Sequence, residues 1–473
     1  MKIIIDGKTI EIEGKRTVLE AARENGIHIP SLCDHPRLIP FSGCRLCLVQ
    51  VKGSRRFLPA CSTDCGEGLE VKTRTPQLVR LRKQILELIL SEHPNACLIC
   101  TEKVHCDDLK STIRKVGEVT GCVLCPNNGR CQLQDIVAEI GLESVGHPSV
   151  YRELEVRRSD PFFDRNYNLC ILCGRCVRIC REVRGLSTLT FIKRGPNTVV
   201  GTAMDESLLR AGCQFCGACV DVCPTGALTE KSMKYEGLPE QTDQTVCTLC
   251  SLGCLMDVHT RGNRILYSQP AANGLVNDGQ ACVKGRFFLK DVVHNPKRVT
   301  QPMVRENQEW VEKDWEETLA FVARKLKTVK SGEMALVESS QASCEEGFVL
   351  RSLAGGILKT GNLIRPHVQA PVSVYQRMMD RAGIQPGLNF DAAAIDGAET
   401  IVVLGADIAA TQPIIWLQVL DAVKYKRAEL IVIASPEFSF SRYAGTWLRL
   451  NPGSETHVLT GISKLILERE EAG

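Results

Sequence analysis

Two segments near the middle of the chain, CILCGRCVRIC (170–180) and CQFCGACVDVCP (213–224), share one cysteine spacing and decide the architecture. In each segment two residues separate the first three cysteines from one another, and three residues precede the fourth. A paired run of this kind holds two [4Fe–4S] clusters, and the fourth cysteine of each run binds the cluster of the other run. The spacing therefore predicts one ligand set of Cys170, Cys173, Cys176 and Cys223, and another of Cys213, Cys216, Cys219 and Cys180.

Cysteine groups on either side of this duplication extend the same chemistry. The chain has 24 cysteines, and all except Cys344 lie between Cys33 and Cys282. Closely spaced C-x2-C steps are ligand spacings rather than the disulfide framework of a secreted protein. We therefore expect metal ligands in a reducing compartment, with Cys344 as a packed core residue.

The N-terminal cysteine group is Cys33-x10-Cys44-x2-Cys47-x13-Cys61. It follows MKIIIDGKTIEIEG (1–14), whose alternating apolar residues predict a β-hairpin, and a short helix. A [2Fe–2S] cluster fits four thiolates on loops that follow a hairpin and helix like those of a ferredoxin. Structural zinc, which also takes four cysteines, is the alternative. Cys65 could replace Cys61, but we expect Cys65 to be a spare thiol.

Residues 93–131 hold two similar cysteine runs. The first is His93-x3-Cys97-x2-Cys100-x5-Cys106, and the second, without a histidine, is Cys122-x2-Cys125-x5-Cys131. These seven side chains fall one ligand short of two four-ligand sites, and His105 or Cys65 could supply the eighth. The region is therefore expected to hold two clusters, or one cluster and one zinc ion.

The last cysteine group is Cys247-x2-Cys250-x3-Cys254-x27-Cys282. Its four thiolates suit another [4Fe–4S] cluster. Zinc ribbons also use widely split cysteine pairs, so zinc is again the alternative.

Composition excludes several classes of protein. The formal net charge of +3 provides no strongly basic face for nucleic acid and no acidic tail. The N-terminus has neither the layout of a signal peptide nor a twin-arginine stretch. No apolar run reaches the roughly 18 residues that a membrane span needs. We therefore expect a cytoplasmic chain with no direct membrane span and no nucleic-acid partner.

The expected fold class is α+β and multidomain. Strands at 399–407 and 428–436, with a helix at 413–426 between them, predict a βαβ unit and a parallel sheet. The expected domains follow the cysteine groups: a ferredoxin-like β-grasp [2Fe–2S] domain (1–80), a His/Cys-rich [4Fe–4S] domain (81–155), a dicluster [4Fe–4S] ferredoxin domain (156–236), a further [4Fe–4S] domain (240–300) and an α/β domain (301–473).

This order of motifs resembles the large iron–sulfur subunit of respiratory complex I and the N-terminal half of NAD-linked formate dehydrogenases. The first part is also similar to [FeFe]-hydrogenases, but no cysteine motif for their catalytic domain follows Cys282. In the family's histidine-ligated motif, His93, Cys97, Cys100 and Cys106 are the simplest ligand set. Residues 129–134, however, look more like the end of that motif, so an exchange with the later run is the alternative: Cys122, Cys125 and Cys131.

Residues 283–473 resemble the beginning of a molybdopterin oxidoreductase domain, in which Lys284 would lie between the cluster and the pterin. The catalytic metal ligand of that family corresponds to the stretch 366–371, where Val368 and Gln369 stand instead. Valine cannot bind molybdenum or tungsten, and glutamine cannot transfer the proton. Since the chain also stops short of a complete domain, we expect a truncated, degenerate domain that docks partners and binds no molybdopterin.

The resemblance implies an electron-transfer subunit of a multi-subunit, NAD(H)-linked oxidoreductase, without a complete active site of its own. It would relay single electrons through one [2Fe–2S] and four or five [4Fe–4S] clusters, between a flavin- and NAD(H)-binding subunit and a further redox or catalytic subunit. Gly-x-Gly-x-x-Gly is absent, which places NAD chemistry in another subunit. The alternative is the iron–sulfur half of a split formate dehydrogenase whose pterin site another chain completes. Arg175, Arg178 and Arg181 are expected either to raise cluster potentials or to be solvated surface charges.

Overall fold

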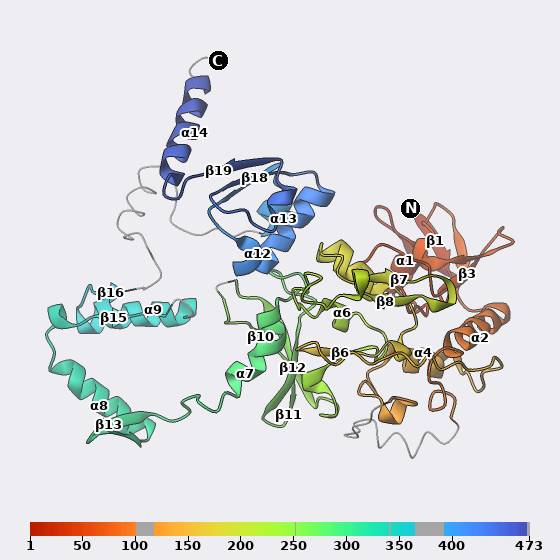
Figure 1. Cartoon of the computed structure of the whole chain (residues 1–473), viewed down its shortest axis with the longest axis horizontal. Coiled ribbons are helices and arrows are strands. Elements are labelled where there is room, and N and C mark those ends of the chain that lie inside the picture. The colour runs from red at the N-terminus through yellow and green to blue at the C-terminus, as the bar shows by residue number, and fades with distance from the viewer. Residues whose placement is uncertain (101–117, 251, 340–341, 365–391, 471–473) are drawn as a thin grey trace.

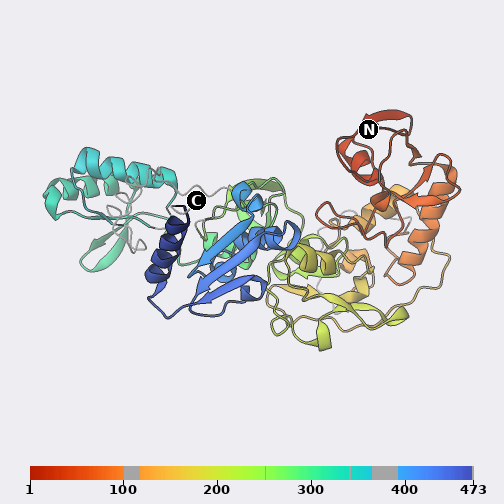
Figure 2. The same ribbon diagram turned by 90° about the horizontal axis from the view of Figure 1, so that it is seen from above.

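The computed structural model describes residues 1–100, 118–250, 252–339, 342–364 and 392–470. The N-terminal sheet lies at one end of the long axis and the cysteine-rich domains follow toward the middle, whereas the C-terminal sheet lies back beside this middle part (Figure 1). Seen from above, the segment around α8 and α9 lies at the opposite end, beyond the C-terminal sheet (Figure 2). The cysteine groups therefore lie in the half of the molecule that includes the N-terminus.

The N-terminal sheet contains the predicted hairpin, which pairs antiparallel, and α1 (Val18–Glu24) follows it. Thr17 caps α1 by accepting a hydrogen bond from the Glu20 N–H, and the Glu20 carboxylate accepts one from the Thr17 N–H. This reciprocal pair satisfies amides that the first turn of a helix leaves free. In spatial order the strands are β2 (Lys8–Glu11), β1 (Lys2–Ile5), β5 (Glu70–Lys72), β3 (Leu48–Val51) and β4 (Phe57–Pro59).

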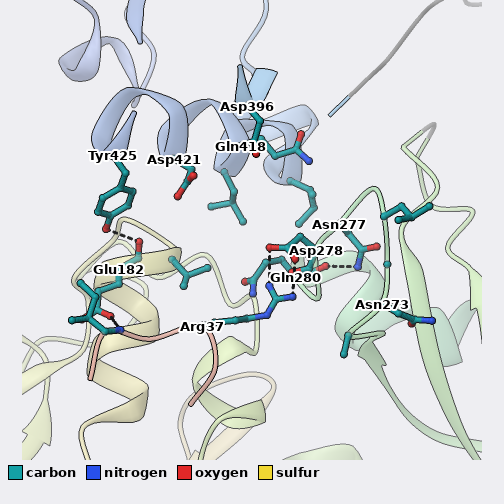
Figure 3. A pocket seen from close by; sticks show the side chains of 17 residues that line it. Arg37, Glu182, Asn273, Asn277, Asp278, Gln280, Asp396, Gln418, Asp421 and Tyr425 are labelled. Carbon is teal, nitrogen blue, oxygen red and sulfur yellow. Dashed lines mark hydrogen bonds and ion pairs between the residues drawn. The ribbon is translucent and has the colours of Figure 1, made fainter. Parts of the chain in front are cut away.

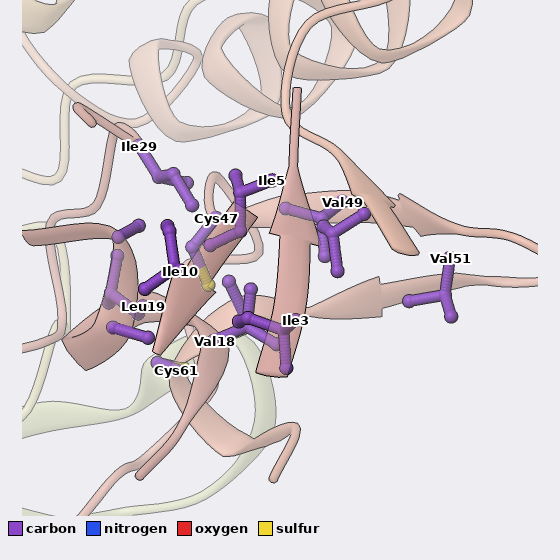
Figure 4. Packing of buried hydrophobic residues seen from close by; sticks show 14 of the residues in the cluster. Ile3, Ile5, Ile10, Val18, Leu19, Ile29, Cys47, Val49, Val51 and Cys61 are labelled. Atoms are coloured by element: carbon purple, nitrogen blue, oxygen red, sulfur yellow. The ribbon is translucent and has the colours of Figure 1, made fainter. Parts of the chain in front are cut away.

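The core beneath this sheet is apolar and reaches two of the predicted cluster ligands. Ile3 and Ile5 alternate with exposed or half-buried residues along β1, which buries one face of the strand. They pack with Val18 of α1, and Cys47 and Cys61 lie in the same buried cluster (Figure 4). The core therefore fixes the backbone that carries half of the N-terminal cysteine group.

Two helices frame the second cysteine region. α2 (Pro76–Leu90) begins at Thr75, with Pro76 at its first position, and α4 (Gln132–Ile140) ends at Gly141 in the left-handed conformation. The helices pack against each other through buried residues that include Leu86, Leu90, Leu133 and Val137.

The dicluster region is built from short elements, as expected for a chain wrapped around cofactors. α5 (Arg175–Arg178) runs into the π-helix η4 (Ile179–Val183), and α6 (Ala218–Asp221) carries the equivalent part of the second run. Antiparallel pairs close the region: β6 (Phe163–Arg165) with β9 (Leu228–Glu230), and β7 (Thr190–Ile192) with β8 (Val199–Gly201).

The next region is an antiparallel meander in the order β10 (Gln241–Val246), β11 (Leu255–Arg261) and β12 (Arg264–Pro270). The π-helix η8 (Lys284–Phe288) and α7 (Leu289–Val293) pack beside β12. Three of the predicted ligands, Cys247, Cys250 and Cys254, lie between β10 and β11, where the Cys247 N–H donates to the Cys254 carbonyl.

The C-terminal α/β domain confirms the predicted βαβ unit. β17 (Thr400–Leu404) pairs parallel with β18 (Glu429–Ala434), and α13 (Pro413–Tyr425) connects them. β18 pairs parallel with β19 (Thr446–Arg449) on its other side. α12 (Ile408–Thr411) precedes α13, and α14 (Glu455–Glu470) follows β19.

The segment between these regions contains hairpin β13 (Met303–Glu306) and β14 (Glu309–Glu312), α8 (Trp315–Lys327), and α9 (Cys344–Ser352) beside the pair β15 (Leu336–Val337) and β16 (Leu363–Ile364). The prediction that Cys344 is a packed core residue is wrong. Cys344 is exposed because it is the first residue of α9, whose one buried position among the described residues is Gly347.

The α+β multidomain class expected from the sequence is confirmed by these sheets and helices. Among the described residues, no helix combines the length and the apolar composition needed to cross a bilayer.

Candidate iron–sulfur cluster sites

The N-terminal cysteines form two close pairs. The thiols of Cys33 and Cys44 share a hydrogen bond that lowers the pKa of Cys44 to about 6 and raises that of Cys33. A second hydrogen bond, between Cys47 and Cys61, lowers the pKa of Cys61 to about 7. A [2Fe–2S] cluster has four cysteine ligands on two irons, so two pairs of adjacent thiols match its needs.

Backbone and hydroxyl donors surround these sulfurs. The N–H of Leu32 donates to Cys44 Sγ and the N–H of Cys44 donates to Cys33 Sγ, each at 3.4 Å. Ser42 Oγ lies 3.3 Å from Cys61 Sγ. Hydrogen bonds to sulfur stabilise thiolates and tune a bound cluster. Cys65 packs against the buried cluster that includes Cys47 and Cys61, and its pKa is raised by burial and by Asp64 and two glutamates of α1.

The dicluster cysteines gather in two groups that mix the two sequence runs. Cys180 of the first run lines one cavity with three cysteines of the second run, Cys213, Cys216 and Cys219. Cys223 of the second run lies within electrostatic range of Cys170, Cys173 and Cys176, because its charge raises the pKa of each, although burial is the larger cause. The arrangement brings together the two crossed ligand sets that the spacing predicts.

In the 93–131 region the structure brings His93 together with the later cysteine run. One cavity is lined by His93, Cys122, Cys125 and Cys131. Burial lowers the pKa of His93 to about 4, so its imidazole is neutral and able to bind a metal. Burial raises the pKa of Cys125 to about 11 and that of Cys131 to about 12.

The earlier run does not share that cavity. Cys97 and Cys100 are half-buried and are absent from its described lining, whereas Leu98 between them lies within it. The Cys97 thiol instead shares a hydrogen bond with Cys122, which lowers the pKa of Cys97 to about 5. Cys106 and His105 lie outside the described residues.

The fourth cysteine group lines a single cavity together with Lys284. Its ligand candidates are Cys247, Cys250, Cys254 and Cys282. Ala410 and Thr411 of α12 and Pro413 of α13 form the opposite wall, so the C-terminal domain covers this group. Gly285 packs beside Cys247, where an added Cβ would lie 3.3 Å from its Sγ.

Among the described residues, no three Cys, His, Asp or Glu side chains lie close enough to share one metal ion. The thiolates around a [4Fe–4S] cluster bind different iron atoms, so they lie farther apart than the ligands of one zinc ion. Three cavities are each lined by four candidate ligands.

Buried arginines lie between the cysteine groups. Arg178 donates to the carbonyl of Cys33, so it connects the dicluster region with the N-terminal group. Arg184 donates to the carbonyl of Ala281, next to the fourth group, at 3.3 Å. Arg175 is 4% exposed and donates to Gln132 Oε1 at 2.7 Å. The prediction of solvated charges is thus wrong for Arg175 and Arg178, whereas Arg181 is exposed.

An ion-pair network around the fully buried Arg286, which sequence reasoning missed, connects the dicluster region with the fourth group. Arg286 Nη1 donates to Glu230 Oε2 at 2.5 Å, and Arg286 Nη2 donates to Asp221 Oδ1 at 2.8 Å. No local signal could have identified these partners, because each lies more than 50 positions away in the chain. The network holds η8, and hence Lys284, against α6 and β9.

A large cavity of about 820 Å³ lies among the N-terminal, dicluster, fourth-cysteine and C-terminal regions (Figure 3). Arg37 pairs with Asp278 at 2.9 Å on one wall, and the Tyr425 hydroxyl donates to the Glu182 carbonyl at 3.0 Å on another. Its described lining includes no cysteine. The cavity therefore lies between domains and contains none of the candidate ligand groups.

Family models match most of the chain in successive segments, with residues 118–159 between two of them. In order, they are the 2Fe-2S iron-sulfur cluster binding domain (1–76), the NADH-ubiquinone oxidoreductase-G iron-sulfur binding region (82–117), the NADH-quinone oxidoreductase subunit 3 ferredoxin-like domain (160–229), the molybdopterin oxidoreductase Fe4S4 domain (240–294) and molybdopterin oxidoreductase (298–471). The chain carries the domain series of an iron–sulfur oxidoreductase subunit. This result confirms the resemblance inferred from the motifs.

Curated relatives share this series. NADPH-Fe(3+) oxidoreductase subunit alpha of Geobacter sulfurreducens is 28% identical over 99% of this chain and 52% of its own length. An NADH-quinone oxidoreductase subunit of Rhizobium meliloti is 29% identical over 100% of this chain and 52% of its own length. A putative formate dehydrogenase of Bacillus subtilis is 26% identical over 99% of this chain and 50% of its own length. The chain thus spans about half the length of the relatives it matches.

The position expected for the molybdenum or tungsten ligand, residues 366–371, lies outside the described residues. The match to molybdopterin oxidoreductase confirms the type of the C-terminal domain. The absence of a pterin from this chain stays a prediction.

Proposed function

We propose that the chain relays single electrons inside a multi-subunit, NAD(H)-linked oxidoreductase, through one [2Fe–2S] cluster and four or five [4Fe–4S] clusters. The observation that carries the proposal is the continuity of the cysteine groups: each packs against the next within one folded body. Bound clusters would supply one-electron redox chemistry. The protein's own residues hold them, bury them and set the charge around them.

Direct contacts support this continuity. Cys125 of the 93–131 region packs on the same small apolar cluster as Cys170 and Cys223 of the dicluster region. The charge of Cys176 contributes to the raised pKa of Cys219, after burial and the charges of Cys216 and Cys213, so the two dicluster groups are neighbours. Arg178 and Arg184 connect these groups to the first and last sites.

The partners we propose are a flavin- and NAD(H)-binding subunit and a further redox or catalytic subunit. The names of the relatives include an NADPH-Fe(3+) oxidoreductase and an NADH-quinone oxidoreductase, both described as subunits. Large apolar side chains are exposed in the segment around α8 and α9, among them Trp310, Trp315 and Phe348. Exposed apolar residues of this size favour protein contacts. We propose that this part of the chain docks a partner in the cytoplasm.

A second candidate is the iron–sulfur half of a split formate dehydrogenase. One observation favours it: Lys284 and the fourth cysteine group lie against the domain that matches molybdopterin oxidoreductase. In this arrangement Lys284 would contact a pterin that another chain helps to enclose.

Metal analysis of the anaerobically purified complex, combined with a redox titration followed by electron paramagnetic resonance, tests both candidates. The relay predicts roughly 18 irons from this chain, or roughly 22 with a fifth [4Fe–4S] cluster, and reversible reduction of every cluster. Stoichiometric molybdenum or tungsten traced to this chain would instead support the split formate dehydrogenase. Clusters that cannot be reduced reversibly would refute an electron-transfer role.

A further inference from the structure

We propose that the histidine-ligated [4Fe–4S] cluster is held by His93 with Cys122, Cys125 and Cys131, and not by the nearer Cys97 and Cys100. This inference rests on the proposed function, since it names the ligands of one cluster in the relay. The matched iron–sulfur binding region, 82–117, includes His93 but ends before the later cysteines begin.

Helix packing brings the two ends of this ligand set together. Leu90, the last residue of α2, packs with Leu133 and Val137 of α4 in one buried cluster. His93 follows α2 by three positions, and Cys131 is the residue that precedes the first turn of α4. The contact between the helices therefore carries His93 to the N-terminal end of α4, where Cys131 lies.

The imidazole of His93 is oriented for metal binding. Its Nδ1 lies 2.9 Å from the carbonyl oxygen of Pro94. A carbonyl can only accept a hydrogen bond, so Nδ1 carries the proton and Nε2 keeps its lone pair. Metal-binding histidines commonly use this hydrogen bond to fix the tautomer and the ring.

The dicluster region leaves space for the two buried sulfurs of the later run. Gly226 lies against Cys125, and a Cβ at this position would be only 2.6 Å from the Cys125 Sγ. Cys131 Sγ lies 3.6 Å from the Pro224 carbonyl, and both Gly226 and Leu169 line the same cavity. Because this wall belongs to the dicluster region, the His93 site is completed only when the two regions pack together.

The earlier cysteines, Cys97 and Cys100, are absent from the described lining of this cavity. The Cys97 thiol hydrogen-bonds Cys122 and lies beside Gly121, where an added Cβ would be 2.7 Å from its Sγ. Cys97 is thus close enough to replace Cys122 if that thiol were removed, whereas the cavity offers no such substitute beside Cys131 among the described residues. Cys131 is accordingly the decisive position for a test, and Cys100 is its matched control.

The experiment compares Cys131→Ser with Cys100→Ser in the full chain, purified anaerobically with its complex and reduced with dithionite. Pulsed electron paramagnetic resonance detects the ¹⁴N coupling of a histidine-bound cluster, and iron is counted in parallel. We expect Cys131→Ser to lose about four irons and the nitrogen coupling, as His93→Ala loses the coupling, whereas Cys100→Ser keeps the nitrogen coupling. A nitrogen-coupled cluster that survives in Cys131→Ser, or is lost in Cys100→Ser, would overturn the assignment.

A second measurement needs no variant and so does not depend on whether a variant folds. Native protein is alkylated before and after a chelator removes its clusters, and each cysteine is followed by mass spectrometry. Cys131 is expected to react only after the nitrogen-coupled cluster is removed; alkylation of Cys131 while that cluster is intact would overturn the assignment. Failure of the proposed function looks different, because no cluster in any variant would then be reversibly reduced.

Discussion

Replacing Arg286 with methionine should destabilise the junction between the dicluster region and the fourth cysteine group. The Arg286 side chain is 0% exposed, and its partner Glu230 is 1% exposed. Burial acts to lower the pKa of Arg286, but Asp221 and Glu230 raise it, so the guanidinium stays charged. Arg286→Met therefore leaves a buried carboxylate without its counter-charge, which costs about 3–5 kcal/mol.

Native-state hydrogen exchange measures this loss where it occurs. Amides of β9 and β12, which flank the Glu230 side chain and the Ser268 carbonyl that Arg286 contacts, should exchange roughly a hundredfold to a few thousandfold faster. Arg261→Met is the matched control, because Arg261 pairs with Glu240 on the surface and should cost at most about 1 kcal/mol.

A double variant separates loss of the charge balance from loss of packing. Adding Glu230→Gln to Arg286→Met removes the orphaned charge, so the double variant should recover part of the lost protection. If Arg286→Met exchanges no faster than Arg261→Met, the reasoning from buried charge is refuted. A double variant that is less protected than the single variant would contradict it as well.

Three further predictions concern the cysteine groups. Cys61→Ser should abolish the [2Fe–2S] signal in electron paramagnetic resonance and Cys65→Ser should leave it intact; the opposite result would exchange their roles. Arg175→Gln removes a buried positive charge, so the reduction equilibrium of the nearest cluster should shift at least about tenfold toward the oxidised form. This shift corresponds to about 59 mV for one electron, and Arg181→Gln should cause no comparable shift. Gly226→Val places a Cβ about 2.6 Å from the Cys125 Sγ and should lower the iron content by about four per chain. Unchanged iron content would show that the residues around Gly226 can move to make room for the side chain.

Much of the architecture could be predicted from sequence because its determinants are local. The hairpin over β1 and β2 and the βαβ unit around α13 were expected from the pattern of apolar residues, and both are present. The N-terminal and fourth cysteine groups were each recognised from one short stretch of chain, and each group is gathered in one place. Cys344 was misplaced because burial of a single thiol depends on what its helix packs against, which periodicity does not reveal.

For residues 93–131, the local sequence does not decide which cysteines join His93. The two cysteine runs have the same internal spacing, so the sequence alone offers His93 two equivalent sets of partners. The packing of α2 on α4 removes this equivalence, because it places His93 at the cavity of the later run. The buried arginines behave in the same way, since Arg175 and Arg286 have their polar partners in distant parts of the chain.

The sequence by itself therefore determined the cofactor chemistry, the order of the cysteine groups and the domain types, since cysteine spacing and side-chain periodicity are properties of neighbouring residues. Tertiary structure alone decided which of two equally spaced cysteine runs lies beside His93, which arginines are buried, and how each cysteine group contacts the next. The physical reason is that helix packing and charge burial depend on contacts between residues that are distant in sequence, which spacing along the chain does not encode.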